Sequence, residues 1–187
     1  MQTKRTICVY CGSKEGPNPA YGQAADQLGQ RLGQRGWDLV YGGGHVGLMG
    51  RLADAAVASG SRVIGVIPRP LQDRELGHGG IDELAVVEDM HQRKAMMAAK
   101  ADAFLTLPGG YGTLEELFEV IAWSQLQLHQ KPVGLLNIEG YYDPLLAFID
   151  RAVNEQFIHR EHRDLLLVED QVDTILERLS QALGSIL

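Results

Sequence analysis

The sequence predicts an α/β fold: a Rossmann-like, doubly wound parallel sheet of about seven strands, with helices on both faces, in a single domain over residues 1–187. Three observations predict it. Short apolar runs alternate with longer amphipathic stretches along the chain. The apolar runs are continuous, which is typical of parallel strands covered on both faces. The chain has 187 residues, of which 45% are hydrophobic, enough for one full core and too few for two substantial ones.

Seven apolar runs have the length and composition of strands, and residues 62–67 and 103–107 are the clearest examples. Helical patterns fill the intervals between them. One long irregular segment, residues 68–80, is rich in glycine, proline and charge, and such a segment inside a compact domain is often a functional loop. The predicted strands lie near residues 5–11, 38–41, 62–67, 84–88, 102–107, 132–137 and 164–168.

Charge and hydropathy exclude several classes of partner. The net charge of -7 argues against a nucleic-acid partner, because nucleic-acid binding relies on basic surfaces. Any bound phosphate must therefore be held locally. The N-terminus leads directly into the apolar run 7–10 with no signal-peptide core, and no apolar stretch approaches the roughly 20 residues of a membrane helix. We expect a cytoplasmic protein with no membrane partner.

Cys8 and Cys11 are the only cysteines, and their C-x-x-C spacing raises the alternative of a redox pair. Both fall within or at the end of the first predicted strand. We therefore expect buried core thiols.

In a doubly wound sheet, ligands collect beyond the carboxyl ends of the strands, and the glycine-rich segment 41–50 meets that condition. It follows a strand, opens a helix and contains G-x-G-x-x-G, so the backbone at Gly43 and Gly44 could approach a phosphate. A dinucleotide site also expects an acidic residue about 20 positions on, where this chain has Pro-Arg-Pro at 68–70. Binding of NAD to this segment is therefore disfavoured, whereas binding of a mononucleotide is compatible with it. A tight turn with no ligand remains the alternative.

A second glycine-rich segment, residues 108–113, lies between a buried strand and a helix that we expect to start near Thr113. Three glycines in four positions expose a row of backbone donors, and the threonine hydroxyl adds another. This loop is the best phosphate cradle in the chain. The candidate contacts are Gly109, Gly110, Tyr111, Gly112 and Thr113.

Glu116 has two interpretations. Thr113-x-x-Glu116 ahead of an apolar helix is a capping box, in which the carboxylate bonds back to the N–H of Thr113. A carboxylate beside a phosphate cradle could also reach a bound sugar or water, as a catalytic group does. Spacing alone favours the cap. Glu115 and Glu119 point elsewhere on the helix, toward the surface or a partner.

The third segment, residues 88–94, starts the helix after the fourth predicted strand. Asp89 can cap this helix with Gln92 as its partner, which leaves Arg93 and Lys94 in the first or second turn. Cations are unfavourable at a helix N-terminus, so two adjacent ones indicate a bound anion. Surface placement of both side chains is the alternative.

Together these motifs closely resemble the LONELY GUY (LOG) family, the cytokinin riboside 5′-monophosphate phosphoribohydrolases. The pairing of Met90-His91-x-Arg93-Lys94 with Pro108-Gly109-Gly110-x-Gly112-Thr113-x-x-Glu116 is specific, whereas either half alone is not. The likeness spans most of the chain and includes Cys11-Gly12-Ser13, Tyr41-Gly42-Gly43-Gly44, Gly47-Leu48-Met49-Gly50, Lys131-Pro132-Val133-Gly134-Leu135-Leu136-Asn137 and Gly140-Tyr141-Tyr142.

The resemblance implies hydrolysis of the N-glycosidic bond of an N6-modified adenosine 5′-monophosphate, giving free base and ribose 5-phosphate, with no metal or organic cofactor. By position, Arg93 and Glu116 match the catalytic pair of the family. Lys94, residues 110–115 (Glu115 included) and Glu75 match positions that contact substrate. The resemblance also implies a homodimer with its active site near the subunit interface.

Three alternatives stay open beside this activity. A lysine decarboxylase would need pyridoxal phosphate on a Schiff-base lysine, and none of the five lysines lies in a recognisable cofactor motif. A non-catalytic nucleotide or cofactor carrier would need the glycines but has no evident use for Arg93 and Glu116 together. A nucleosidase with broader purine specificity fits the same residues, because base preference depends on pocket walls that the sequence does not place.

Overall fold

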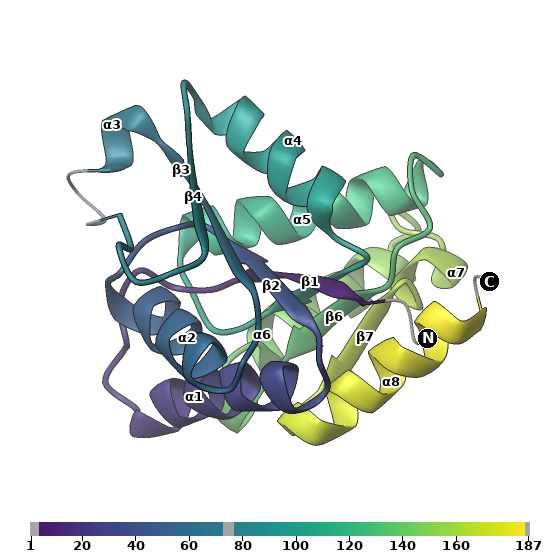
Figure 1. The fold of residues 1–187 in the computed structure, drawn as a ribbon. Helices are drawn as coiled ribbons and strands as arrows, with labels where there is room; N and C mark the ends of the chain where they lie inside the picture. Colours follow the sequence, from purple (N-terminus) through teal and green to yellow (C-terminus); the bar gives the residue numbers. More distant parts are fainter. Residues whose placement is uncertain (1–3, 73–76, 186–187) are drawn as a thin grey trace.

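The computed structural model describes residues 4–72 and 77–185, and these residues form the predicted architecture (Figure 1). All seven predicted strands are present in one sheet, and every neighbouring pair is parallel. The strands are β1 (Thr6–Tyr10), β2 (Asp38–Tyr41), β3 (Val63–Pro68), β4 (Glu83–Val87), β5 (Ala103–Thr106), β6 (Val133–Leu136) and β7 (Leu166–Glu169).

The order of the strands across the sheet is β4-β3-β2-β1-β5-β6-β7. From β1 the chain winds outward through β2 and β3 to β4, then crosses back to β5 on the other side of β1. The winding direction therefore reverses between β1 and β5. In open parallel sheets the crevice at such a reversal is the usual place for a ligand, because the two neighbouring loops diverge there.

Helices cover both faces of the sheet, and successive strand residues pack against opposite layers. In β1, Ile7 and Val9 join one core, while Cys8 and Tyr10 join the other. Figure 1 shows α1, α2 and α8 on one side of the sheet and α4 and α5 on the opposite side. The first layer holds α1 (Pro19–Gln34), α2 (Gly47–Ala58) and α8 (Val172–Ser185); the second holds α4 (Met90–Lys100), α5 (Tyr111–Gln125) and α6 (Asp143–Asn154).

The segment 68–80 is less irregular than the sequence indicates. Its first part forms the short helix α3 (Arg69–Gln72), and Gly77 pairs with Gly44 in an isolated antiparallel bridge. Glu75, a predicted substrate contact, lies outside the described residues. Two further short helices are η1 (Ile138–Gly140) and α7 (Arg160–Arg163). Among the helices of the described ranges, none combines the length and apolar character needed to cross a bilayer.

The expectation for the cysteines is confirmed. Cys8 and Cys11 are both buried and form no disulfide. Burial raises the pKa of the Cys8 thiol, which keeps that thiol protonated near neutral pH. Both residues therefore act as small apolar core side chains.

Candidate active site

A pocket of about 200 Å³ opens at the carboxyl ends of the strands, where the winding reverses. The loop after β1 and the loop after β5 meet there, and Gly12 N–H donates to the Pro108 carbonyl at 3.0 Å. The pocket brings together parts of all three predicted motifs. Its lining includes Gly12 and Ser13 after β1, Gly42 after β2, Met90 and Arg93 on α4, Gly110 just before α5, and Tyr111, Gly112, Thr113 and Glu116 on α5.

Arg93 is fixed in this pocket by backbone carbonyl groups. The side chain of Asp89 caps α4, as predicted, and accepts a hydrogen bond from the N–H of Gln92 at 2.8 Å. One turn later, Arg93 is 5% exposed. Its Nε donates to the Val66 carbonyl at 3.1 Å, and its Nη2 donates to the Gly42 carbonyl at 2.7 Å. The guanidinium is therefore held in one orientation by β3 and by the loop after β2.

Position 42 requires glycine for a steric reason that the sequence motif does not reveal. A Cβ at this position would lie 2.1 Å from Nη2 of Arg93. Glycine is needed here so that the buried guanidinium can approach the backbone. The neighbouring Gly43 and Gly44 are not part of the pocket lining in the described structure. The Gly43 carbonyl accepts a hydrogen bond from the N–H of His78 at 2.9 Å, so this part of the loop pairs with the segment before β4.

The phosphate-cradle loop leads directly into α5. The helix begins at Tyr111 with Gly110 as N-cap, two residues earlier than the sequence predicts. Because no side chain caps this end, the N–H groups of the first turn point out of the helix toward the pocket. A Cβ at Gly110 or Gly112 would meet no atom within 4 Å, which leaves room for a ligand. Gly109 differs, since its Cβ would lie 2.1 Å from Oγ1 of Thr113.

The early start of α5 corrects the interpretation of Glu116. Thr113 is the third residue of the helix and cannot be its N-cap, so the predicted capping box is wrong. Glu116 lies in the second turn, is 8% exposed and lines the same pocket as Arg93. Its position is therefore not explained as a helix cap, and its carboxylate faces the place where a substrate could bind.

Tyr10 is another polar group in the pocket wall. Burial is the main cause that raises the pKa of its phenol, with Cys8, Glu116 and Glu119 adding to the effect. The phenol therefore stays protonated and is unsuited to act as a base near neutral pH. This leaves Glu116 as the carboxylate of the pocket lining that can act as a base or stabilise a cation.

Lys94 joins α4 to α5. Its Nζ lies 2.9 Å from the carboxylate of Glu119 and also contacts Glu115. Burial alone would lower the pKa of Lys94, but the hydrogen bonds from its ammonium to the two carboxylates outweigh burial and raise it. Lys94 is thus a protonated ammonium beside the pocket. The sequence predicts Glu115 and Glu119 as surface or partner contacts, whereas in the structure both carboxylates pair with Lys94 of the same chain.

A second pocket of about 410 Å³ adjoins the first and shares Gly12, Ser13 and Gly110 with it. Tyr21 and Tyr141 form its aromatic wall, and the hydroxyl of Tyr141 donates to the Gly109 carbonyl at 2.7 Å. Residues 12 and 13 are not among the site residues predicted from the sequence. Their place directly after β1, at the strand next to β5, is the signal that could have found them.

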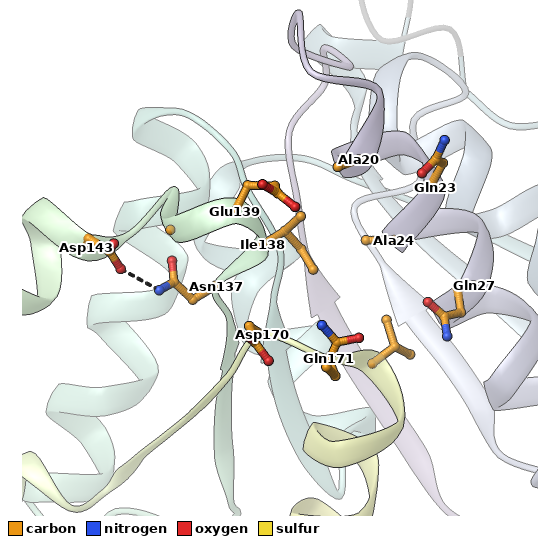
Figure 2. A pocket seen from close by; sticks show the side chains of 12 residues that line it. Ala20, Gln23, Ala24, Gln27, Asn137, Ile138, Glu139, Asp143, Asp170 and Gln171 are labelled. Atoms are coloured by element: carbon orange, nitrogen blue, oxygen red, sulfur yellow. Dashed lines mark hydrogen bonds between the residues drawn. The ribbon is translucent and has the colours of Figure 1, made fainter.

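A larger pocket of about 490 Å³ lies away from Arg93 and Glu116, beyond the carboxyl ends of β6 and β7 (Figure 2). Figure 2 shows Gln23 and Gln27 of α1 facing Asn137 and Gln171 across the hollow. Its lining holds amides and carboxylates and includes no lysine or arginine of the described chain. It is therefore poorly suited to a phosphate, despite its size.

The packing of Gly42 against Arg93 gives a stability prediction. We expect Gly42→Ala to lower the free energy of unfolding by about 1–3 kcal/mol, because the added methyl must displace a buried, hydrogen-bonded guanidinium. Gly112→Ala is the matched control, since its methyl enters open space within α5 and alanine favours helix. Urea unfolding measures both variants. Equal stability of Gly42→Ala and the parent protein would contradict the assigned contact.

Known proteins resemble this chain over most of its length. The family model described as "Possible lysine decarboxylase" matches residues 49–179. The cytokinin riboside 5′-monophosphate phosphoribohydrolase LOG7 of Arabidopsis thaliana is 53% identical over 177 residues, which cover 95% of this chain and 82% of that protein. The phosphoribohydrolase LOG of Oryza sativa subsp. japonica is 56% identical over 163 residues, covering 87% of this chain and 67% of that protein.

Solved structures show the same fold at lower identity. A molybdenum cofactor binding protein from Rippkaea orientalis superimposes with a TM-score of 0.73 at 23% identity, covering 97% of this chain and 98% of its own. This likeness concerns the fold alone. The family model and the sequence relatives show the family as well as the fold. By both, the chain belongs to the LONELY GUY family of cytokinin riboside 5′-monophosphate phosphoribohydrolases.

Proposed function

We propose that this protein hydrolyses the N-glycosidic bond of N6-modified adenosine 5′-monophosphates and releases the free base and ribose 5-phosphate. One observation carries the proposal: Arg93 from α4 and Glu116 from α5 line one small pocket, together with the unblocked N-terminus of α5. A buried cation, a buried carboxylate and a set of backbone donors are the groups that this reaction needs. The names of the sequence relatives describe the same activity.

Glu116 takes the central chemical role. As the bond from C1′ of the ribose to the base nitrogen breaks, positive charge develops on the sugar, and a nearby carboxylate stabilises it. The same carboxylate can accept a proton from the attacking water, whose oxygen then bonds to C1′. The proton taken from the water passes to the departing base nitrogen, so the products are the free base and ribose 5-phosphate and Glu116 returns to its starting form. Because Glu116 lies in a pocket wall and is only 8% exposed, its charge acts with little screening by water.

Arg93 supplies the complementary charge. Its two bonds to backbone carbonyls fix the direction of the guanidinium, so the group is oriented before substrate binds. In this place it orients the anionic nucleotide and supports the ionised form of Glu116. Lysine would not replace it, because one ammonium cannot reach both carbonyls in the planar geometry of a guanidinium.

The 5′-phosphate is proposed to bind at the start of α5. The N–H groups at residues 111–113 belong to the first helical turn, where the helix dipole favours an anion. Gly110 and Gly112 leave open space beside them. The net charge of -7 makes such a local site necessary, since the protein as a whole repels anions. Contacts of the nucleotide with Gly43, Gly44, Glu75, Lys94 and Glu115 stay predictions.

A pyridoxal-dependent lysine decarboxylase is disfavoured by the state of Lys94. A Schiff-base lysine must be a neutral amine to react, whereas Glu115 and Glu119 hold Lys94 as an ammonium. A pure carrier shares the fold but has no use for a catalytic carboxylate beside a fixed arginine. A broader purine nucleotide nucleosidase differs only in the base that it accepts.

An assay of base release tests the proposed reaction. Purified protein is incubated with isopentenyladenosine 5′-monophosphate, AMP or isopentenyladenosine, and free base and ribose 5-phosphate are separated by chromatography. We expect release from isopentenyladenosine 5′-monophosphate and none from the unphosphorylated nucleoside, because the helix terminus must hold a phosphate. Release of adenine from AMP would indicate a broader purine nucleotide nucleosidase, and its absence would indicate specificity for N6-modified bases. No release from any of the three compounds would favour the carrier.

Substitution of Glu116 tests its chemical role. Glu116→Gln preserves the shape of the side chain but can neither accept a proton nor carry charge, so we expect kcat to fall at least about 100-fold. Glu177→Gln on α8 is the control, because this carboxylate is exposed on the other layer of helices. Steady-state kinetics and thermal unfolding are measured for both. Unchanged kcat in Glu116→Gln would leave Glu116 a structural residue.

We also propose that the protein is a homodimer. Phe118 on α5, Phe148 on α6 and Phe157 are large apolar side chains exposed on this chain, and such side chains commonly lie in subunit contacts. Sedimentation equilibrium is expected to give twice the mass of one chain. Phe148→Glu should shift the equilibrium toward the monomer, and Val57→Glu on α2 should not. A monomeric parent protein would contradict this proposal.

A further inference from the structure

A second cluster of polar side chains lies outside the proposed active site, where the loop after β2 meets the segment before β4. His45 from the loop, Asp54 from α2 and His78 from the segment each offer one donor atom, and these atoms all lie within 4.8 Å of one another. None of the three lines the pocket of Arg93 and Glu116. His78 is buried, whereas His45 and Asp54 are exposed, so water can reach one side of the cluster.

The distances within the cluster suit a metal ion. Nε2 of His78 lies 3.0 Å from Oδ1 of Asp54. Two ligands at about 2.0–2.2 Å from one ion, near tetrahedral angles, are separated by roughly this distance or slightly more. The rings of His45 and His78 stand edge to face with centroids 4.3 Å apart. The donor nitrogen of the exposed His45 lies within 4.8 Å of the other two donor atoms, so binding of an ion requires its side chain to move closer to them.

We propose that His45, Asp54 and His78 form a binding site for a divalent transition-metal ion such as Zn²⁺, with water completing the coordination. Two imidazole nitrogens and one carboxylate oxygen are the donor set of three-ligand zinc sites. This set disfavours Mg²⁺ and Ca²⁺, which prefer oxygen ligands alone. The site is separate from the hydrolytic reaction and supplies nothing to it chemically.

The tautomer of His78 adds a structural requirement. Without an ion, Nδ1 accepts a hydrogen bond from the N–H of Gly80 at 3.0 Å, so the ring proton is on Nε2 and faces Asp54. An ion takes the place of that proton, and Nδ1 must then carry one. Binding of an ion therefore requires the peptide between Gly79 and Gly80 to turn its carbonyl toward Nδ1 in place of the Gly80 N–H, a backbone change for which glycine is the most permissive residue. The resulting N–H to carbonyl contact is the common support of a metal-bound histidine.

The ion would join segments that already meet. Gly44 pairs with Gly77, and the N–H of His78 donates to the Gly43 carbonyl at 2.9 Å. The carbonyl of Gly42, the residue before Gly43, accepts the hydrogen bond from the Arg93 guanidinium. A metal bound by His45 and His78 therefore clamps the loop that orients the guanidinium. The expected consequence is higher thermal stability, because the ion binds the folded chain and not the unfolded one.

Metal binding is tested on the full chain without a purification tag, after treatment with a chelator. Calorimetric titration with ZnCl₂ is expected to show one ion per chain with a micromolar or tighter Kd, unaffected by about a hundredfold excess of Mg²⁺. Zn²⁺ should raise the melting temperature. Co²⁺ should give the absorption bands of a site with nitrogen and oxygen ligands and no sulfur-to-metal band, which excludes Cys8 and Cys11 as ligands.

Variants locate the ion. His45→Ala is expected to weaken Zn²⁺ binding at least about 100-fold, since it removes a direct ligand. Asp54→Asn keeps an acceptor for His78 but loses the charge, and should also weaken binding. His159→Ala is the control, because His159 belongs to a separate pair of histidines with His162. Loss of binding in the control alone, equal binding in His45→Ala and the parent, or no binding to the parent would each overturn the proposal.

Discussion

The site depends on how the Arg93 guanidinium is held. Two hydrogen bonds fix it, one to the backbone carbonyl of Val66 and one to that of Gly42. These bonds connect α4 to β3 and to the loop after β2, the strand next to the reversal of winding between β1 and β5. They require a glycine at 42 and a helix N-terminus that directs residue 93 inward. The pocket of Glu116 and the α5 terminus closes around this fixed cation.

The parallel order of the sheet explains why three distant segments of sequence form one site. Residues 12–13, Gly42 and residues 110–113 each follow the carboxyl end of a strand, and β2, β1 and β5 are neighbours. The site therefore needs no insertion or extra domain to bring them together. The helices α4 and α5 pack on the same face of the sheet. The cation of the site, Arg93, comes from α4, and its carboxylate, Glu116, comes from α5. The larger pocket near Asn137 and Asp170 lacks such a pair (Figure 2).

The strands, their parallel pairing and the meeting of the motifs could be predicted from the sequence, because continuous apolar runs determine both the strands and the layers. The contacts that require particular residues in the site could not be predicted from the sequence. Gly42 lies 51 positions from Arg93, and no local pattern shows that their backbone and side chain touch. The capping box at Thr113 and Glu116 was wrong because α5 starts two residues earlier, with Gly110 as its N-cap. The ammonium of Lys94 likewise meets Glu119 through packing of α4 on α5, which periodicity within one helix does not reveal.

In the proposed reaction, one pocket binds the phosphate at the start of α5 and presents the ribose to residue 116. The most direct measurement is a crystal structure of the Glu116→Gln variant with isopentenyladenosine 5′-monophosphate bound. We expect phosphate oxygens within hydrogen-bond distance of the N–H groups at residues 111–113, with C1′ facing residue 116 and the guanidinium of Arg93 still on the carbonyls of Val66 and Gly42. A nucleotide bound instead in the pocket of Asn137 and Asp170, with the pocket of Arg93 unused, would contradict it.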